Sequence, residues 1–290
     1  MSSGFLDHPR PIAFAHRGGA AHAPENSWRA FEDAVGLGYG YLETDLQATS
    51  DGVLVAFHDR TLDRVTSRTG RIARMTHREL SGALIGGTEP IPLLEDLLGA
   101  WPDVRFNIDL KDSPAVRPLA KVLRRTAAWD RVCVVSFSAS RLRAARRIFD
   151  RQVCMAASPI GTAVVRFGGP HASSEGGPAR SAAPLRTAGG PGGSPEAQVK
   201  LAPRHGPHAA LAERLARTGV RCAQVPPSIA TELFVGRAHA LGLQVHVWTV
   251  NDTATMTSLL DLGVDGIMTD ETVALRDVLI RRGQWHPRHG

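Results

Sequence analysis

Residues 221–269 read RCAQVPPSIATELFVGRAHALGLQVHVWTVNDTATMTSLLDLGVDGIMT, and in this stretch short apolar strands alternate with helical patterns. Strands are predicted at Arg221–Val225, Gln244–Val250 and Gly266–Thr269, with helices at Ile229–Leu241 and Ala254–Leu262. Nearly continuous apolar strands are typical of a parallel sheet that is covered on both faces. Gly242 and Gly263 follow the two helices, where a left-handed helix end favours glycine. The stretch therefore predicts consecutive βα units.

The same alternation extends over the rest of the chain. Five more strands are predicted, at Ile12–His16, Gly40–Leu46, Arg105–Lys111, Val132–Phe137 and Gln152–Ala157. Further helices are predicted at Asn26–Leu37, Leu93–Ala100, Pro114–Ala127, Ala139–Phe149, His208–Thr218 and Val273–Arg281. Eight βα units in a chain of 290 residues predict an α/β protein with a (β/α)8 TIM barrel. A doubly wound open sheet is the alternative.

Two segments interrupt the alternation within a single predicted domain of residues 1–290. Residues 53–90 follow the second strand and contain a short predicted strand at Val53–Phe57. Residues 168–206 contain 9 glycines and 6 prolines among 39 residues, with almost no aliphatic side chains. Such a segment cannot bury enough apolar surface to order itself, so we expect a disordered loop after the fifth strand.

The composition excludes several classes of protein. A hydrophobic content of 43% is too high for a disordered chain. No apolar run approaches the roughly 18 residues that span a bilayer, and the first residues lack a signal-peptide pattern. We therefore expect a cytoplasmic protein without membrane insertion. The net charge of +6 comes from scattered basic residues without interleaved aromatics, which disfavours nucleic acid and suits a small anionic substrate.

The three cysteines of the chain are Cys133, Cys154 and Cys222. They lie in or beside apolar stretches and lack the spacing of metal ligands. We expect buried thiols of a reducing compartment.

Ionisable side chains stand at the carboxyl ends of several predicted strands, which is where barrel enzymes have their active sites. The residues at these ends are His16, Arg17, Glu43, Asp45, His58, Asp109, Lys111 and Trp248. Charged groups inside apolar strands are costly unless they are paired or bound to a metal. Their convergence at one end of the barrel predicts an active site.

Three of these residues are carboxylates. Glu43 and Asp45 are two apart on one strand and so point to the same face, and Asp109 belongs to the neighbouring unit. Carboxylates that share a site raise one another's pKa, so a cation is expected among them. An all-oxygen ligand set suits Mg²⁺, Ca²⁺ or Mn²⁺ rather than zinc. The alternative is that Glu43 or Asp109 only pairs with an arginine at a strand end.

The other residues suggest phosphoryl chemistry. His16 and His58 are candidates for general acid and base, because histidine titrates near neutrality. Arg17 and Lys111 add two cations, which together with a metal would clamp a phosphoryl group. Trp248 is either core packing or an apolar wall for the alcohol part of a substrate.

At these residues the sequence resembles the glycerophosphodiester phosphodiesterase family. The similar stretches begin with AHRGGAAHAPENSWRAFEDAVGLGYGYLETDLQATSDGVLVAFHDRTLDRVTSRTG and continue with FNIDLK, VHVWTVND and GVDGIMTD. The resemblance implies a TIM barrel with a small insertion after the second strand, here at residues 58–90. It implies hydrolysis of glycerophosphodiesters to an alcohol and glycerol 3-phosphate with a divalent metal.

The resemblance also assigns roles to particular residues. It implies that His16 and His58 are the general acid–base pair and that Glu43, Asp45 and Asp109 are the metal ligands. Arg17 and Lys111 would contact the phosphate, and Trp248 is the tryptophan of the family's WTVN element. Asp109 stands where the family usually has glutamate, and Ser27 stands where it usually has threonine.

Three other functions remain open from the sequence. The barrel would also suit a lysophospholipase D or another phosphodiesterase, such as one that cleaves phosphoinositides. A lipid substrate calls for an apolar loop or amphipathic helix at the barrel mouth. We find none in the sequence, which favours soluble substrates. A phosphate-binding protein without catalysis, and a protein that interacts through residues 168–206, are the remaining alternatives.

Overall fold

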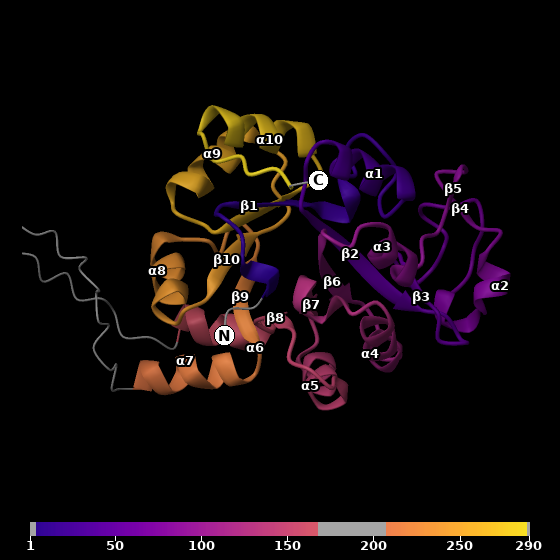
Figure 1. The fold of residues 1–290 in the computed structure, drawn as a ribbon, viewed down its shortest axis with the longest axis horizontal. Helices are drawn as coiled ribbons and strands as arrows, with labels where there is room; N and C mark the ends of the chain where they lie inside the picture. Colours follow the sequence, from indigo (N-terminus) through magenta and orange to yellow (C-terminus); the bar gives the residue numbers. More distant parts are fainter. Residues whose placement is uncertain (1–3, 168–206, 289–290) are drawn as a thin grey trace, which may run out of the picture.

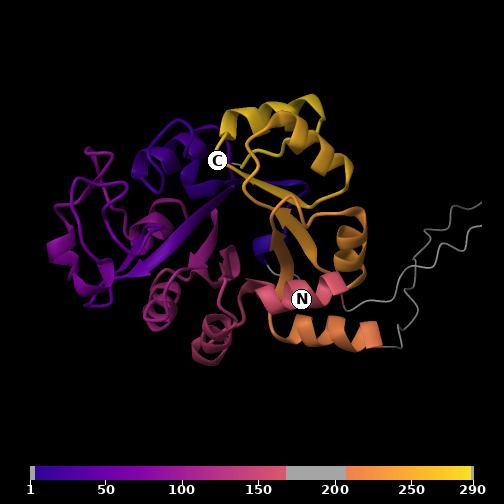
Figure 2. The ribbon, with the colours of Figure 1, turned by 180° about the vertical axis from the view of Figure 1, so that it is seen from behind.

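The computed structural model describes residues 4–167 and 207–288 of the chain. The segment predicted to be a disordered loop, residues 168–206, lies outside the described residues. Within them, eight parallel strands form a closed barrel that is surrounded by helices (Figure 1; Figure 2). No described helix combines the length and the apolar character that crossing a bilayer requires.

The barrel strands follow one another around the sheet in chain order. They are β1 (Ile12–Ala15), β2 (Tyr41–Ala48), β6 (Arg105–Leu110), β7 (Val132–Val135), β8 (Cys154–Ala156), β9 (Val220–Val225), β10 (Gln244–Val247) and β11 (Gly266–Thr269). Strand β1 pairs with β11 and also with β2, where Ala15 lies opposite Leu42, so the sheet has no free edge there. This closure confirms the TIM barrel and excludes the open sheet.

Helices follow the strands and cover the outside of the barrel. The longer ones are α1 (Trp28–Gly36), α3 (Leu94–Ala100), α4 (Val116–Arg125), α5 (Ala139–Ile148), α6 (Pro159–Phe167), α7 (Pro207–Arg217), α8 (Glu232–Ala240), α9 (Thr253–Asp261) and α10 (Thr272–Arg281). Side chains of Ser27, Ser138, Thr231 and Asp252 cap the starts of α1, α5, α8 and α9 by accepting backbone hydrogen bonds. Helix α6 was not predicted from the sequence.

The segment after β2 forms a small lobe beside the barrel (Figure 1). Strand β3 (Leu54–Ala56) runs antiparallel to β2, and α2 (His77–Leu80) precedes the hairpin of β4 (Leu84–Ile85) and β5 (Glu89–Pro90). The lobe has its own apolar cluster, which includes Phe57, Leu62, Ile72 and Leu80. That cluster explains why this segment can order itself without a barrel strand of its own.

All three cysteines lie inside the barrel, on β7, β8 and β9. They are buried and form no disulfide, as the sequence analysis expected. Their sulfur atoms all come within 4.8 Å of one another, although 21 and 68 residues separate them along the chain. Burial raises the pKa of the Cys133 thiol well above its ordinary value. The Cys133 thiol therefore stays protonated near neutral pH.

Candidate active site

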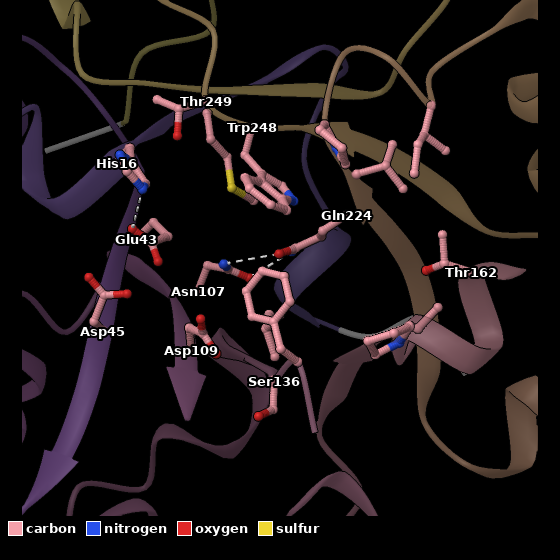
Figure 3. A pocket seen from close by; sticks show the side chains of 18 of the residues that line it. His16, Glu43, Asp45, Asn107, Asp109, Ser136, Thr162, Gln224, Trp248 and Thr249 are labelled. Carbon is pink, nitrogen blue, oxygen red and sulfur yellow. Dashed lines mark hydrogen bonds and ion pairs between the residues drawn. The ribbon is translucent and has the colours of Figure 1, made fainter. Parts of the chain in front are cut away.

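The carboxyl ends of the strands open into a pocket of about 400 Å³ (Figure 3). All eight residues that the sequence placed at this end of the barrel line it: His16, Arg17, Glu43, Asp45, His58, Asp109, Lys111 and Trp248. They come from five separate segments of the chain. Because the strands are parallel and the barrel is closed, their carboxyl ends meet around one opening.

A tight glycine turn after β1 places His16 and Arg17 at the pocket. Gly18 and Gly19 have positive φ angles of 85° and 94°. A Cβ atom on Gly18 would lie 2.8 Å from that of Ala30 in α1, and one on Gly19 would lie 2.6 Å from a methyl group of Thr272 in α10. Only glycine therefore lets the turn pack this closely between the two helices. The turn aims the backbone N–H of Arg17 at Glu43, to which it donates at 3.0 Å.

The three carboxylates lie on the same side of the pocket (Figure 3). In the register of β2 and β6, Asp45 stands directly beside Asp109. The ammonium group of Lys111 bridges them, at 2.8 Å from Asp45 and 2.7 Å from Asp109. The Arg17 Nε atom lies 3.1 Å from the other oxygen of Asp45. Two cations thus already balance part of the negative charge.

The loop before α1 supports this cluster through residues that the sequence analysis did not assign to it. Asn26 was predicted to be helical, but α1 begins at Trp28 and Asn26 has a φ angle of 55°. Its side chain donates to Asp45 at 3.1 Å and accepts from Thr44 at 2.7 Å. Glu25 accepts hydrogen bonds from Arg17 and from Arg64 of the small lobe. The loop therefore joins the barrel, the carboxylates and the lobe.

The pKa values of the three carboxylates differ because their surroundings differ. Burial, together with the charge of Asp45, raises the pKa of Glu43 to about 7. Burial also raises the pKa of Asp109, although Lys111 opposes the effect. For Asp45, burial is outweighed by Lys111 and Arg17, and its pKa falls below its ordinary value. Such divergent values among close carboxylates are typical of functional sites.

The donor set fits a hard divalent cation. Asp109 Oδ1 is buried and has no hydrogen-bond partner among the described residues. The nearby oxygens of Glu43 and Asp45 are carboxylate donors of the kind that Mg²⁺, Ca²⁺ and Mn²⁺ prefer. Over the described ranges, however, it is the three cysteines and not these carboxylates whose ligand atoms all lie within 4.8 Å of one another. Holding a cation with all three carboxylates therefore requires a small movement of their side chains.

Each of the two histidines has a carboxylate partner at Nδ1. His16 Nδ1 lies 2.7 Å from Asp270, and His58 Nδ1 lies 2.6 Å from Asp59. A carboxylate at Nδ1 holds that proton and leaves Nε2 for exchange with a ligand. Burial lowers the pKa of His16, but the charge of Glu43 and the bond to Asp270 outweigh it, so the net pKa is raised. Asp270 follows β11 and lies 254 residues from His16, so sequence spacing did not reveal it.

The opposite part of the pocket is apolar. Trp248 lines it, with its ring 5.5 Å from that of Phe137 in an edge-to-face arrangement. Helix α6 lines it through Pro159, Ala163 and Phe167, and Figure 3 shows Thr162 of this helix across the pocket from the carboxylates. The expectation that no amphipathic helix stands at the barrel mouth is therefore wrong.

Helix α6 escaped prediction because its local signals are weak. Gly161 and a run of β-branched residues lower its helix propensity, and it directly precedes the glycine-rich segment. Its start is nevertheless marked by Ser158, whose hydroxyl accepts from the backbone N–H of Gly161 at 3.2 Å, and by Pro159 in the first turn. The helix also packs against α8, and a contact between residues so far apart in the chain leaves no local pattern in the sequence.

A polar pair in the pocket lining crosses the barrel. Gln224 donates to the side-chain oxygen of Asn107 at 2.8 Å, from a strand on the other side of the barrel (Figure 3). Gln224 also reaches the sulfur of Cys222 at 3.9 Å. Both residues line the pocket, and Gln224 connects it with the cysteines.

Comparisons of the sequence with known proteins find similarity along most of the chain. The sequence model of the "Glycerophosphoryl diester phosphodiesterase family" matches residues 16–158 and 197–274. The chain is 38% identical to a protein of Mycobacterium tuberculosis named "Probable glycerophosphodiester phosphodiesterase 2", over 97% of this chain and 95% of that protein. It is 28% identical to a glycerophosphodiester phosphodiesterase of Bacillus altitudinis, over 89% and 93% of the two chains.

Solved structures share the fold. A phosphodiesterase of Oleispira antarctica, solved in complex with the product sn-glycerol-3-phosphate, superposes with a TM-score of 0.69 at 20% identity and covers 93% of this chain and 97% of its own. A glycerophosphodiester phosphodiesterase of Agrobacterium tumefaciens has a TM-score of 0.68 at 19% identity, covering 91% and 98%. These two likenesses concern the barrel.

Proposed function

The chain belongs to the glycerophosphoryl diester phosphodiesterase family, and we propose that it hydrolyses glycerophosphodiesters to an alcohol and glycerol 3-phosphate. The observation that carries the proposal is the meeting of two carboxylate-paired histidines with Arg17 and Lys111 in one pocket. A phosphodiester needs cations for its charge, a base for the nucleophile and an acid for the leaving group. This pocket offers all three.

Arg17 and Lys111 would bind the phosphodiester. Both are paired with carboxylates and only slightly exposed, so they are held in place before a substrate arrives. A cation fixed in a partly dry pocket stabilises growing negative charge more than a mobile one in water does. Lys111 keeps its proton firmly, because although burial lowers its pKa, Asp45 and Asp109 raise it further.

His16 and His58 would exchange protons with the reacting groups at Nε2. One histidine accepts the proton of the nucleophile, which is water or the 2-hydroxyl of the glycerol. The other donates a proton to the departing alkoxide. Asp270 and Asp59 keep the Nδ1 proton in place, so that each ring presents the same nitrogen to the pocket throughout the reaction.

We also propose that Glu43, Asp45 and Asp109 hold a divalent cation, Mg²⁺, Ca²⁺ or Mn²⁺. When bound, such a cation neutralises charge on the phosphoryl oxygens. The unpartnered oxygen of Asp109 and the raised pKa of Glu43 support this assignment, since both point to negative charge that the protein itself does not balance. The proposed cytoplasmic location remains a prediction from the sequence.

The test is turnover of glycerophosphocholine by the purified protein, with glycerol 3-phosphate as the product measured. The protein is first treated with EDTA, and each of the three cations is then added separately. We expect turnover to vanish with EDTA and to return with at least one cation. Full activity in excess EDTA would contradict the metal assignment. If glycerophosphocholine and other glycerophosphodiesters are not hydrolysed with any of the three cations, the proposal is wrong.

A matched pair of variants separates the metal site from general stability. Asp109→Asn should abolish turnover and also remove the increase in thermal stability that an added cation gives. Asp112→Asn changes a carboxylate three residues further along that accepts hydrogen bonds from the backbone N–H groups of Ala48 and Ala115 and does not line the pocket. It should cost about 1 kcal/mol of stability and keep the response to the cation.

A further inference from the structure

Every cysteine of the chain lies in one cluster inside the barrel. Cys133, Cys154 and Cys222 come from β7, β8 and β9, and their exposed fractions are 0%, 3% and 0%. Over residues 4–167 and 207–288, they form the one group of three or more histidine, cysteine or acidic side chains whose ligand atoms all lie within 4.8 Å of one another. Cysteines that only fill a core as small apolar residues have no need to meet. Their convergence therefore points to a shared ligand.

The spacing of the sulfur atoms suits a metal ion. Cys133 Sγ lies 4.0 Å from Cys222 Sγ, and neither forms a disulfide. A first-row metal ion lies about 2.3 Å from each thiolate sulfur, and a trigonal arrangement of three such bonds puts the sulfurs about 4 Å apart. The three side chains can therefore close around one ion with only small movements.

The surroundings of the cluster favour a soft ion of low charge. The apolar side chains that pack around the cysteines include Phe5, Phe14 and the thioether of Met268. Sulfur ligands select Cu(I) or Zn²⁺, whereas Mg²⁺ and Ca²⁺ take oxygen ligands. Structural zinc sites have four protein ligands, but the cluster offers three in the part of the chain that the structure describes. Cu(I) needs no more than three sulfurs, and its single charge is less costly to bury than two charges.

Gln224 connects this cluster with the pocket. Its Nε2 lies 3.9 Å from Cys222 Sγ and also donates to Asn107 at 2.8 Å. Gln224 itself lines the pocket. A polar group beside a metal ligand orients that ligand and stabilises its charge. Gln224 therefore gives the cluster a polar partner, and we expect an ion to enter from the pocket by displacing this amide.

We propose that Cys133, Cys154 and Cys222 form a binding site for one Cu(I) ion. This site is distinct from the three carboxylates, which suit a hard cation, and the inference does not depend on the proposed function. A thiol that becomes a thiolate ligand releases its proton to the solvent as the ion binds. Release of one proton leaves a neutral complex, and release of two leaves a single negative charge.

The experiment titrates the reduced full-length protein with Cu(I) in oxygen-free buffer that contains ascorbate, excess Mg²⁺ and the coloured Cu(I) chelator bicinchoninate. The Mg²⁺ occupies sites for hard cations, and the chelator keeps Cu(I) from weak sites such as surface histidines. We expect the protein to take one equivalent of Cu(I) from the chelator and to gain an ultraviolet sulfur-to-copper charge-transfer band. X-ray absorption at the copper edge should find three sulfur neighbours at about 2.3 Å.

Serine variants test each ligand in turn, and a neighbouring residue supplies the matched control. Loss of an outer partner of a metal ligand weakens binding by roughly 10- to 100-fold. Loss of a ligand itself should weaken it at least as much, so Cys133→Ser, Cys154→Ser and Cys222→Ser should each bind Cu(I) at least about tenfold more weakly. Ala223 is also buried on β9 but belongs to the other core cluster. Ala223→Ser adds a buried hydroxyl and should keep the wild-type affinity for Cu(I).

Four results would overturn the inference. They are failure of the wild-type protein to take Cu(I) from bicinchoninate, fewer than three sulfur neighbours, displacement of Cu(I) by an equal concentration of Zn²⁺, and wild-type affinity in the serine variants. X-ray absorption uses the wild-type protein, so it decides the matter even where a serine variant does not fold. Hydrolysis of glycerophosphocholine is measured separately, and its outcome leaves the copper site unaffected.

Discussion

Lowering the pH from 7 to 5 should destabilise the wild-type protein by about 2 kcal/mol more than the variant His246→Met. His246 lies on β10 and is fully buried. Its Nε2 donates to Gln244 at 3.0 Å, and its Nδ1 has no partner among the described residues. Its ring packs 4.9 Å from that of Phe14. An imidazolium here would be poorly solvated.

The magnitude follows from the two pKa values. Burial lowers the pKa of His246 to about 4, with a smaller opposing effect from Asp265, against about 6.5 in the unfolded chain. Between these two pKa values the unfolded state binds more protons than the folded state does. The free energy of unfolding is therefore greatest well above pH 6.5 and falls as the pH drops toward 4. Proton binding to His246 in the unfolded state lowers the free energy of unfolding by about 0.2 kcal/mol at pH 7 and by about 2 kcal/mol at pH 5.

The assay is urea unfolding of both proteins at pH 8, 7, 6 and 5, followed by tryptophan fluorescence. Other groups that titrate in this range contribute equally to both proteins and cancel in the comparison. Between pH 8 and 7 the difference between the two proteins should change by no more than about 0.2 kcal/mol, which is the internal control. Equal losses of stability in both proteins between pH 7 and 5 would refute the reasoning. If the variant does not fold, the His246 ring proton in an NMR titration of the wild type should not shift between pH 8 and 5.

Three more predictions concern the site and the core. His16→Ala and His58→Ala should each lower kcat by about 10²–10⁴-fold with unchanged circular dichroism, and near-wild-type rates in both would rule out their acid–base role. Replacing residues 169–205 by a short Gly/Ser linker should keep kcat/KM within a few-fold of the wild-type value and leave thermal stability nearly unchanged, because the entropy of loop closure depends weakly on loop length. Loss of kcat/KM in a variant that still folds would place the segment in the active site. Ellman's reagent should react with none of the three buried thiols of the native protein within minutes and with all three in guanidinium, and rapid native labelling would contradict their burial.

The barrel and the position of its site followed from local patterns. Apolar runs of strand length, helical periodicity and glycine at helix ends depend on residues close in sequence, and Gly219, Gly242 and Gly263 indeed have positive φ angles. In a parallel barrel every strand delivers its last residues to the same end. The sequence could therefore place Glu43, Asp45, Asp109 and the other candidates in one pocket without knowing any distance between them.

The tertiary structure decided which of these groups touch one another. His16 and Asp270 meet only because β1 and β11 are neighbours in the closed barrel. The three cysteines have no metal-ligand spacing in the sequence. They converge because β7, β8 and β9 are neighbours in the sheet, with Cys133 in register with Cys154 and Cys222 in register with Ala156.

Helix α6 shows most clearly what the sequence could not predict. Its residues have a low helix propensity, and it packs against α8, more than 60 residues away. Periodicity reports which face of an element is apolar. What that face packs against, and which charges a pocket brings together, depends on contacts between residues far apart in the chain, and only the closure of the barrel brings those residues together.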